Sequence, residues 1–131
     1  EYVSLYIDHL EKAGVLLGLR SVLYGHASVR KPEKLYINNT NLYLAINNVE
    51  AGQENIGMLR EIFVANQLIS THKVTSPGES DFRVDDLIFE VGGKSKLNKL
   101  GNYAEGTHFL IDDIETGNDN IIPLYLLGFL Y

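Results

Sequence analysis

The chain has 131 residues, 45% of them hydrophobic and 21% charged, which is the length and composition of a globular protein with one real core. Its formal net charge of −6 at pH 7 excludes a whole-surface attraction to nucleic acid or anionic lipid, so a nucleic-acid contact would need a local basic patch. The sequence has no cysteine for disulfides or thiolate chemistry, and no run approaches the ~20 apolar residues of a membrane span, so we expect a cytoplasmic protein without a membrane partner.

The first 50 residues are predicted to form a helix followed by two short strands. Apolar residues at helical spacing indicate an amphipathic helix over the first dozen residues. A β-like pattern covers residues 15–24, and residues 34–37 form a second extended run after Pro32. This order outlines half of a winged helix. Because the helix opens at residue 1 without a capping residue, we expect the natural protein to continue upstream.

The second part of the chain, residues 51–131, is predicted to be a separate mixed α/β domain. Asn-rich loops around the apolar segment 42–46 indicate a soft boundary near residue 50. The strongest predicted helix covers residues 56–69, whose apolar residues leave little room for a polar face and so indicate burial. The elements expected after it are a turn at Pro77-Gly78, strands at residues 81–84, 87–91 and 108–111, and a last apolar element at residues 121–127.

A hairpin turning at Asp85-Asp86 would bring two acidic side chains together. Its register pairs Val84 with Leu87, Arg83 with Ile88, Phe82 with Phe89, and Asp81 with Glu90. Directly opposed like charges destabilise a sheet, so we expect a bound cation, a lysine or the protonation of one acid to relieve the repulsion. Magnesium suits one or two carboxylates together with a substrate phosphate. A simpler interpretation is an ordinary hairpin with a solvated acidic face and a lysine salt bridge.

Glu61 and Lys94 are candidates to complete this site. The neighbours of Glu61 along its helical stripe are small or apolar, so its carboxylate would emerge from an apolar surface and need a partner. Lys94 shares strand parity with Glu90 through Gly92, and a bend at the Gly-Gly pair would bring its ammonium toward the same pocket. A small basic cluster, which a phosphate backbone could contact but which more often means a solvated face, consists of Lys94, Lys96 and Lys99.

Several runs together resemble a known family over nearly the whole chain. They are Gly57-Met-Leu-Arg-Glu61-Ile-Phe, Asp81-Phe-Arg-Val, Phe89-Glu90-Val-Gly-Gly-Lys94, the upstream Leu10-Glu-Lys-Ala-Gly-Val and Lys34-Leu-Tyr-Ile-Asn-Asn-Thr-Asn, and the ending Ile122-Pro-Leu-Tyr-Leu-Leu-Gly-Phe-Leu-Tyr131. The combination resembles the C-terminal domain that follows the ATPase module in a widespread family of bacterial AAA+ ATP-binding proteins. That domain is similar to the PD-(D/E)XK nuclease superfamily, whose fold is restriction-endonuclease-like.

The resemblance implies a role for each candidate residue. Asp81 and Glu90 would bind magnesium, Glu61 would be the helix-borne third carboxylate, and Lys94 would stabilise the attacking water or the transition-state charge. The superfamily's lysine stands two residues after the second acid, where this chain has Gly92, so Lys94 would have to compensate from two residues further on.

The implied function is an accessory domain of an AAA+ ATPase that cleaves phosphodiester bonds in nucleic acid with magnesium. ATP would bind to the upstream ATPase module, because Gly93-Lys94-Ser95 lacks the glycine that a phosphate loop needs at position 88. The alternative, from a different class, is a noncatalytic interaction or homo-oligomerisation module of the ATPase with a decayed nuclease site.

Overall fold

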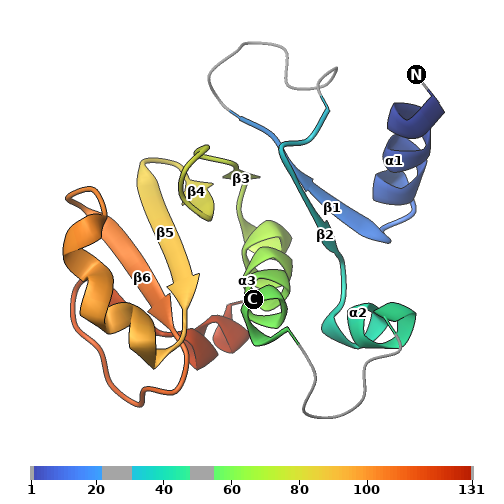
Figure 1. Ribbon diagram of the computed structural model, residues 1–131. Helices are drawn as coiled ribbons and strands as arrows, with labels where there is room; N and C mark the ends of the chain where they lie inside the picture. The colour runs from blue at the N-terminus through green and yellow to red at the C-terminus, as the bar shows by residue number, and fades with distance from the viewer. Residues whose placement is uncertain (1, 22–30, 48–54, 131) are drawn as a thin grey trace.

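The computed structural model describes residues 2–21, 31–47 and 55–130, which form a mixed α+β fold with a five-stranded sheet and flanking helices (Figure 1). The elements in chain order are α1 (Tyr2–Lys12), β1 (Leu16–Leu19), β2 (Lys34–Ile37), α2 (Thr40–Asn47), α3 (Ile56–Thr71), β3 (Val74–Thr75), β4 (Phe82–Val84), β5 (Leu87–Gly92), the 3-10 helix η2 (Lys94–Asn102), β6 (Thr107–Ile111), β7 (Ile121–Pro123) and the 3-10 helix η3 (Leu124–Phe129). The predicted first helix, the strand at residues 34–37 and the long helix from residue 56 are confirmed.

The five-stranded sheet has the order β3-β4-β5-β6-β7, antiparallel from β3 to β5 and parallel from β5 to β7. The predicted hairpin register is confirmed for Phe82 with Phe89, Arg83 with Ile88, and Val84 with Leu87. The fourth predicted pair, Asp81 with Glu90, is not a pair of the ladder, because β4 begins at Phe82. Asp85 occupies the turn with a φ of 52°, a left-handed conformation that aspartate tolerates better than most residues. The turn and the alternation of buried residues together set this register.

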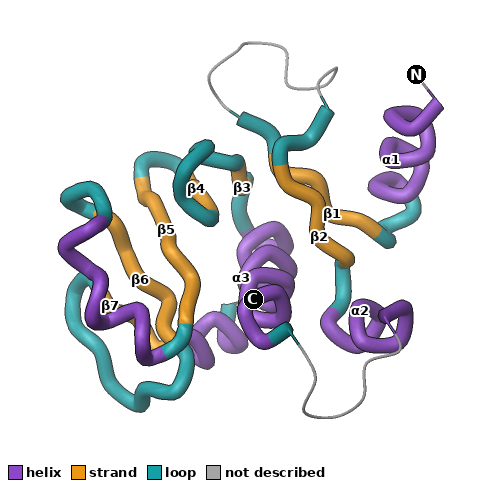
Figure 2. Tube along the Cα trace, in the orientation of Figure 1, coloured by secondary structure: helices purple, strands orange, loops and turns teal. Residues whose placement is uncertain are grey.

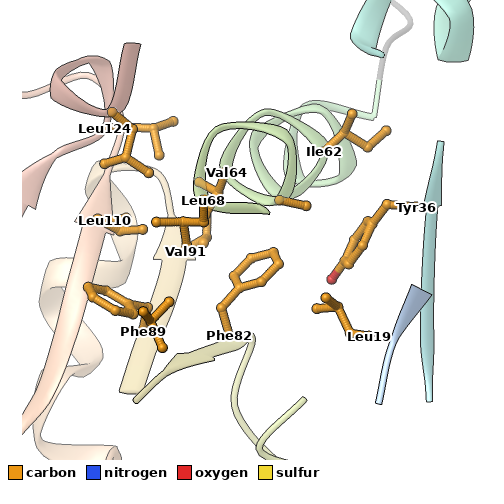
Figure 3. Close-up of a cluster of buried hydrophobic side chains, with 13 residues drawn as sticks. Leu19, Tyr36, Ile62, Val64, Leu68, Phe82, Phe89, Val91, Leu110 and Leu124 are labelled. Carbon is orange, nitrogen blue, oxygen red and sulfur yellow. The ribbon is translucent and has the colours of Figure 1, made fainter. Parts of the chain in front are cut away.

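Helix α3 lies between the five-stranded sheet and the β1-β2 hairpin (Figures 1 and 2). It begins after Asn55, whose side-chain oxygen accepts a hydrogen bond from the backbone N–H of Met58 at 3.1 Å, a standard N-cap. Its buried residues are Ile62, Val64, Ala65 and Leu68. They pack in one cluster with Phe82 and Val91 of the sheet, which confirms the prediction of a buried helix (Figure 3).

The N-terminal segment shares this core. Leu19 of β1 and Tyr36 of β2 belong to the same buried cluster, and the rings of Tyr36 and Phe82 lie 5.6 Å apart between centroids. Asn66 of α3 donates a hydrogen bond at 2.8 Å to the backbone carbonyl of Asn38, directly after β2. The hairpin is therefore packed against α3, and the hydrophobic core is continuous between the two parts.

Some expectations differ from the fold in detail. The β-like run predicted over residues 15–24 is a strand only at residues 16–19, and its last residues, 22–24, lie outside the described residues, as does the boundary expected near residue 50. The apolar stretch from residue 121 is a short strand followed by a 3-10 helix. Strand β3 was not predicted, because two residues show no periodicity. Within the ranges that the structure describes, no helix is long and apolar enough to cross a membrane.

Replacing Phe82 with alanine should destabilise the fold strongly. The side chain is completely buried, with 0% exposed, between the helix and the β1-β2 hairpin. Loss of a buried phenylalanine costs about 3–5 kcal/mol through lost transfer energy and the cavity left behind. Urea unfolding should report this loss, whereas Leu87→Ala at the 47% exposed start of β5 should change stability by less than about 0.5 kcal/mol. Similar losses for the two variants would contradict the assignment of the core.

Candidate functional site

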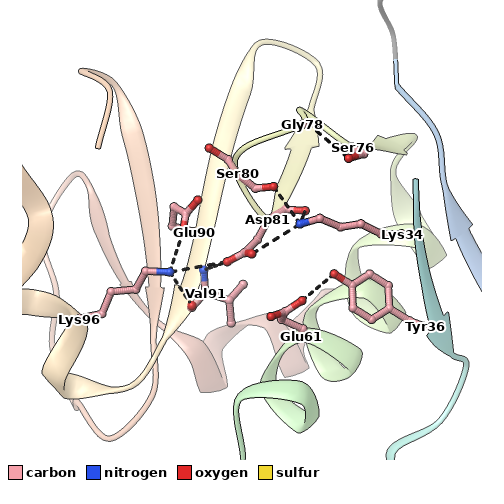
Figure 4. A network of polar contacts seen from close by, with 10 residues as sticks. All are labelled: Lys34, Tyr36, Glu61, Ser76, Gly78, Ser80, Asp81, Glu90, Val91 and Lys96. Atoms are coloured by element: carbon pink, nitrogen blue, oxygen red, sulfur yellow. Dashed lines mark hydrogen bonds and ion pairs between the residues drawn. The ribbon is translucent and has the colours of Figure 1, made fainter. Parts of the chain in front are cut away.

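The β4-β5 hairpin brings Asp81 and Glu90, the acid pair, to one place. Asp81 directly precedes β4, and its Oδ2 accepts a hydrogen bond at 2.8 Å from the backbone N–H of Val91 in β5. The Nζ atom of Lys96 lies 2.6 Å from Oε2 of Glu90 and 3.6 Å from Oδ2 of Asp81 (Figure 4). The two acids predicted to share a cation therefore share the ammonium group of one lysine.

Lys96 reaches the acid pair because the chain turns sharply after β5. The backbone N–H of Lys96 donates to the carbonyl of Gly93 at 2.9 Å, which folds the start of η2 back toward the strand. The ammonium then donates to Glu90 and, at 2.8 Å, to the backbone carbonyl of Val91. Three oxygens, two from β5 and one from the residue before β4, thus surround one cationic group.

Gly92 leaves the space through which the Lys96 side chain passes. A Cβ atom at position 92 would lie 2.5 Å from Cδ of Lys96, closer than such atoms can pack, and 3.1 Å from Cβ of Lys96. A side chain at position 92 and this conformation of Lys96 are therefore mutually exclusive. Glycine at position 92 is therefore the condition that lets a lysine four residues later reach the acids.

Lys94 does not take the place that strand parity predicted for it. Strand parity would hold only for a chain that stays extended through residue 94, but β5 ends at Gly92 and η2 begins at Lys94. Lys94 is exposed, and no contact among the described residues joins it to either acid. The signal that could have identified Lys96 is the second lysine of the Lys-Ser-Lys run, one 3-10 turn after Gly93.

The ion pair between Lys96 and Glu90 is nearly removed from solvent. The Glu90 side chain is 6% exposed and that of Lys96 is 16% exposed. Burial by itself lowers the pKa of the Lys96 ammonium, but the hydrogen bond to Glu90 and the charges of both acids outweigh this effect and raise it overall. Lys96 is therefore protonated at neutral pH and supplies the countercharge that a buried carboxylate needs.

Glu61 has the partner that its apolar surroundings require, and this partner is Tyr36 of β2. The Tyr36 hydroxyl donates a hydrogen bond to Oε2 of Glu61 at 2.7 Å (Figure 4). Burial, then the hydrogen bond to Glu61 and its negative charge, raise the pKa of Tyr36. Tyr36 was not predicted, because its contact with Glu61 spans 25 residues and leaves no local pattern in the sequence.

A second lysine, Lys34, approaches the acid pair from β2. Its Nζ atom donates to the backbone carbonyls of Ser80 at 2.9 Å and Asp81 at 3.1 Å, and lies 3.6 Å from Oδ1 of Asp81. The two carboxylate oxygens of Asp81 therefore face different ammonium groups, with Lys34 near Oδ1 and Lys96 near Oδ2. Lys34 was not predicted either, since 47 residues separate it from Asp81.

The oxygens around Lys96 fit a hard divalent cation. Two carboxylates and the carbonyl of Val91 already surround one positive group, and magnesium prefers oxygen ligands of this kind, completing its shell with water. Among the described residues, no three or more His, Cys, Asp and Glu side chains are grouped so that they could hold a metal ion. Glu61 thus does not join Asp81 and Glu90 in such a group, and these two are the candidate ligands.

Comparison of the chain with protein-family models, with curated proteins and with solved structures finds no match. What the site can do follows from the chemistry and placement of its residues. The carboxylates of Asp81 and Glu90 share the ammonium group of Lys96. The Glu61 carboxylate accepts a hydrogen bond from buried Tyr36, and Lys34 donates to the backbone carbonyl of Asp81. Carboxylates that bind a divalent cation beside a fixed ammonium can stabilise the charge that develops on a transferring phosphoryl group.

Replacing Gly92 with alanine should displace Lys96. The added Cβ would force the lysine away from Glu90, and loss of the partner of a buried charge costs about 3 kcal/mol. Urea unfolding should show a loss of about 2 kcal/mol or more, because part of the contact can re-form. Gly101→Ala, where an added Cβ meets open space, is the matched control and should change stability by less than about 0.5 kcal/mol. Equal stabilities of the two variants would refute the packing of Lys96 over Gly92.

The Tyr36 phenol should stay neutral to a higher pH in the folded protein than an ordinary tyrosine does. Because its pKa is raised on folding, the neutral phenol contributes stability that is present below about pH 10 and is lost as the pH rises further. Subtracting the tyrosinate absorbance titration of Tyr36→Phe from that of the wild type, with its eight tyrosines, should therefore isolate one late step. A difference curve with its midpoint near pH 10 would show that the phenol is not held by Glu61.

Proposed function

We propose that this chain is a magnesium-dependent phosphodiesterase of the PD-(D/E)XK type, with Asp81 and Glu90 as the metal ligands and Lys96 as the lysine. One observation carries the proposal: a lysine ammonium contacts both acids although the usual lysine position holds Gly92. The side chain crosses directly over that glycine, so a lysine from a different position of the sequence places its ammonium beside both acids. The helix before an antiparallel hairpin and the parallel strand after it support a restriction-endonuclease-like architecture.

The charges of the site favour a metal before a phosphodiester substrate. Two ammonium groups face three carboxylates, those of Asp81, Glu90 and Glu61, so the site keeps a negative formal charge that repels phosphate. One divalent cation reverses this sign. When bound, magnesium supplies a polarised phosphate oxygen and a bound water of lowered pKa. The Lys96 ammonium, fixed beside the acids, is placed to offset the negative charge that develops on the phosphate.

Nucleic acid is the substrate class that the surrounding charges support. The chain as a whole is acidic, so a phosphate backbone needs local cations. Helix η2 provides them, because Lys94 and Lys99 are exposed on the same short element that carries Lys96. The sequence resemblance further supports a role as the accessory domain of an AAA+ ATPase, in which ATP binds to the upstream module.

Cleavage of a panel of DNA and RNA substrates tests the proposal. The wild type should cleave in magnesium and stop when the metal is chelated. Glu90→Gln, which keeps a hydrogen-bond acceptor for Lys96, and Lys96→Met should each lower the rate by about 10²-fold or more. Lys94→Met removes the same charge from an exposed site where it would contact only the nucleic-acid backbone, so with saturating substrate it should change the rate by less than about threefold.

Thermal unfolding of each variant separates lost chemistry from lost folding. If the folded wild type cleaves no substrate in magnesium, the chain is better described as a noncatalytic interaction or oligomerisation module. If Lys94→Met is as damaging as Lys96→Met, then Lys96 is not the lysine of the site.

A further inference from the structure

Strand β2 presents two polar side chains toward the candidate site. Lys34 and Tyr36 stand two residues apart, so they point to the same side of the strand, and each contacts one acid of the site (Figure 4). Leu35 between them is 41% exposed, as expected for the opposite side. The side of β2 that faces the protein interior therefore carries both a core residue, Tyr36, and a residue that contacts Asp81, Lys34.

Lys34 acts on the segment that carries Asp81. Its ammonium donates to the carbonyls of Ser80 and Asp81, two consecutive residues of the chain entering β4. Hydrogen bonds from a charged donor are stronger than neutral ones, and two of them to neighbouring carbonyls hold that short backbone segment in one orientation. This segment carries the side chain of Asp81, whose carboxylate accepts a hydrogen bond from the backbone N–H of Val91.

Strand β2 is itself held in the position that lets Lys34 reach this segment. The Tyr36 ring packs on Phe82, its hydroxyl binds Glu61, and Asn66 donates to the carbonyl of Asn38. These contacts come from α3 and the sheet, and they hold the chain at positions two and four residues after Lys34. The reach of Lys34 is thus set by tertiary packing, and a shift of the hairpin would move its ammonium.

We propose that Lys34 is a positioning residue of the site, supplied by the upstream β1-β2 hairpin, which fixes the Asp81 carboxylate for binding a divalent cation. This inference rests on the proposed function, because it assumes that Asp81 is a metal ligand. It makes the site composite: the acid pair belongs to the sheet, and the group that orients one acid belongs to the N-terminal segment. Cation binding and docking of the hairpin then stabilise each other, since such coupling is reciprocal.

Titration of the full chain with Mn²⁺, followed by electron paramagnetic resonance of the free ion, measures the effect directly. Groups that orient a metal ligand contribute about 10–100-fold to metal affinity. Lys34→Met should therefore weaken Mn²⁺ binding by about tenfold or more, and Lys34→Arg, which keeps the charge and the donors, should recover most of the loss. If Lys34 acted only as a nearby positive charge, the affinity for Mn²⁺ would change in the opposite direction, because removal of the charge would tighten Mn²⁺ binding.

Two matched controls come from the same hairpin. Lys31→Met removes an exposed positive charge, and Leu35→Ala shortens a side chain on the opposite side of β2. Each should leave the Mn²⁺ affinity within about twofold of the wild type, since neither touches the Asp81 segment. Unchanged or tighter binding by Lys34→Met, with the controls also unchanged, would overturn the proposal.

A readout without metal separates this inference from the proposed function. The Val91 amide donates to Asp81, so its hydrogen exchange reports whether the carboxylate is in place. In Lys34→Met, exchange at Val91 should accelerate by about tenfold while the amides of β6 stay unchanged, because the loss is local. If wild-type Mn²⁺ binding fails but Val91 responds, the proposed function is wrong and the positioning of Asp81 stands. If Val91 does not respond, Lys34 does not position Asp81.

Discussion

The buried carboxylate of Glu90 imposes the constraint on which the site depends. With 6% of its side chain exposed, it needs a positive partner within the protein, and Lys96 provides one at 2.6 Å. That contact requires the tight turn after β5 and a residue without a side chain at position 92. The contact between Lys96 and Glu90 therefore depends on the hairpin register, the glycine pair and the start of η2 together. A change in any one of them would break it.

The continuity of the core gives the N-terminal segment its place in this arrangement. Leu19 and Tyr36 pack in the same cluster as the sheet and α3, so the β1-β2 hairpin is not an independent attachment. Because the hairpin is held by buried contacts, it can deliver polar groups to a defined point. The same packing that stabilises the fold thus brings Lys34 to Asp81 and Tyr36 to Glu61. Stability and site geometry share their determinants here, so substitutions on β2 are expected to affect both.

Local patterns were sufficient for much of the fold. The alternation of residues 81–91 and the Asp-Asp turn predicted the hairpin and its register, and the apolar run from residue 56 predicted a buried helix. Local patterns failed where an element is too short to show a periodicity, as in the two-residue strand β3. The amphipathic helix α1 forms as expected, but none of its described residues is buried, because amphipathicity indicates a face suited to burial and cannot supply a surface to cover it.

The sequence by itself determined that Asp81 and Glu90 lie together, since strand periodicity and the turn set which residues oppose each other within a dozen positions. The need of Glu61 for a partner also followed from its apolar neighbours. Only the tertiary structure decided which groups meet these acids. Lys96, not Lys94, contacts the acids because β5 ends at Gly92 and the chain turns into η2. Lys34 and Tyr36 come from a hairpin that packs against α3. Contacts between segments so far apart depend on how whole elements pack, and no local spacing carries that information.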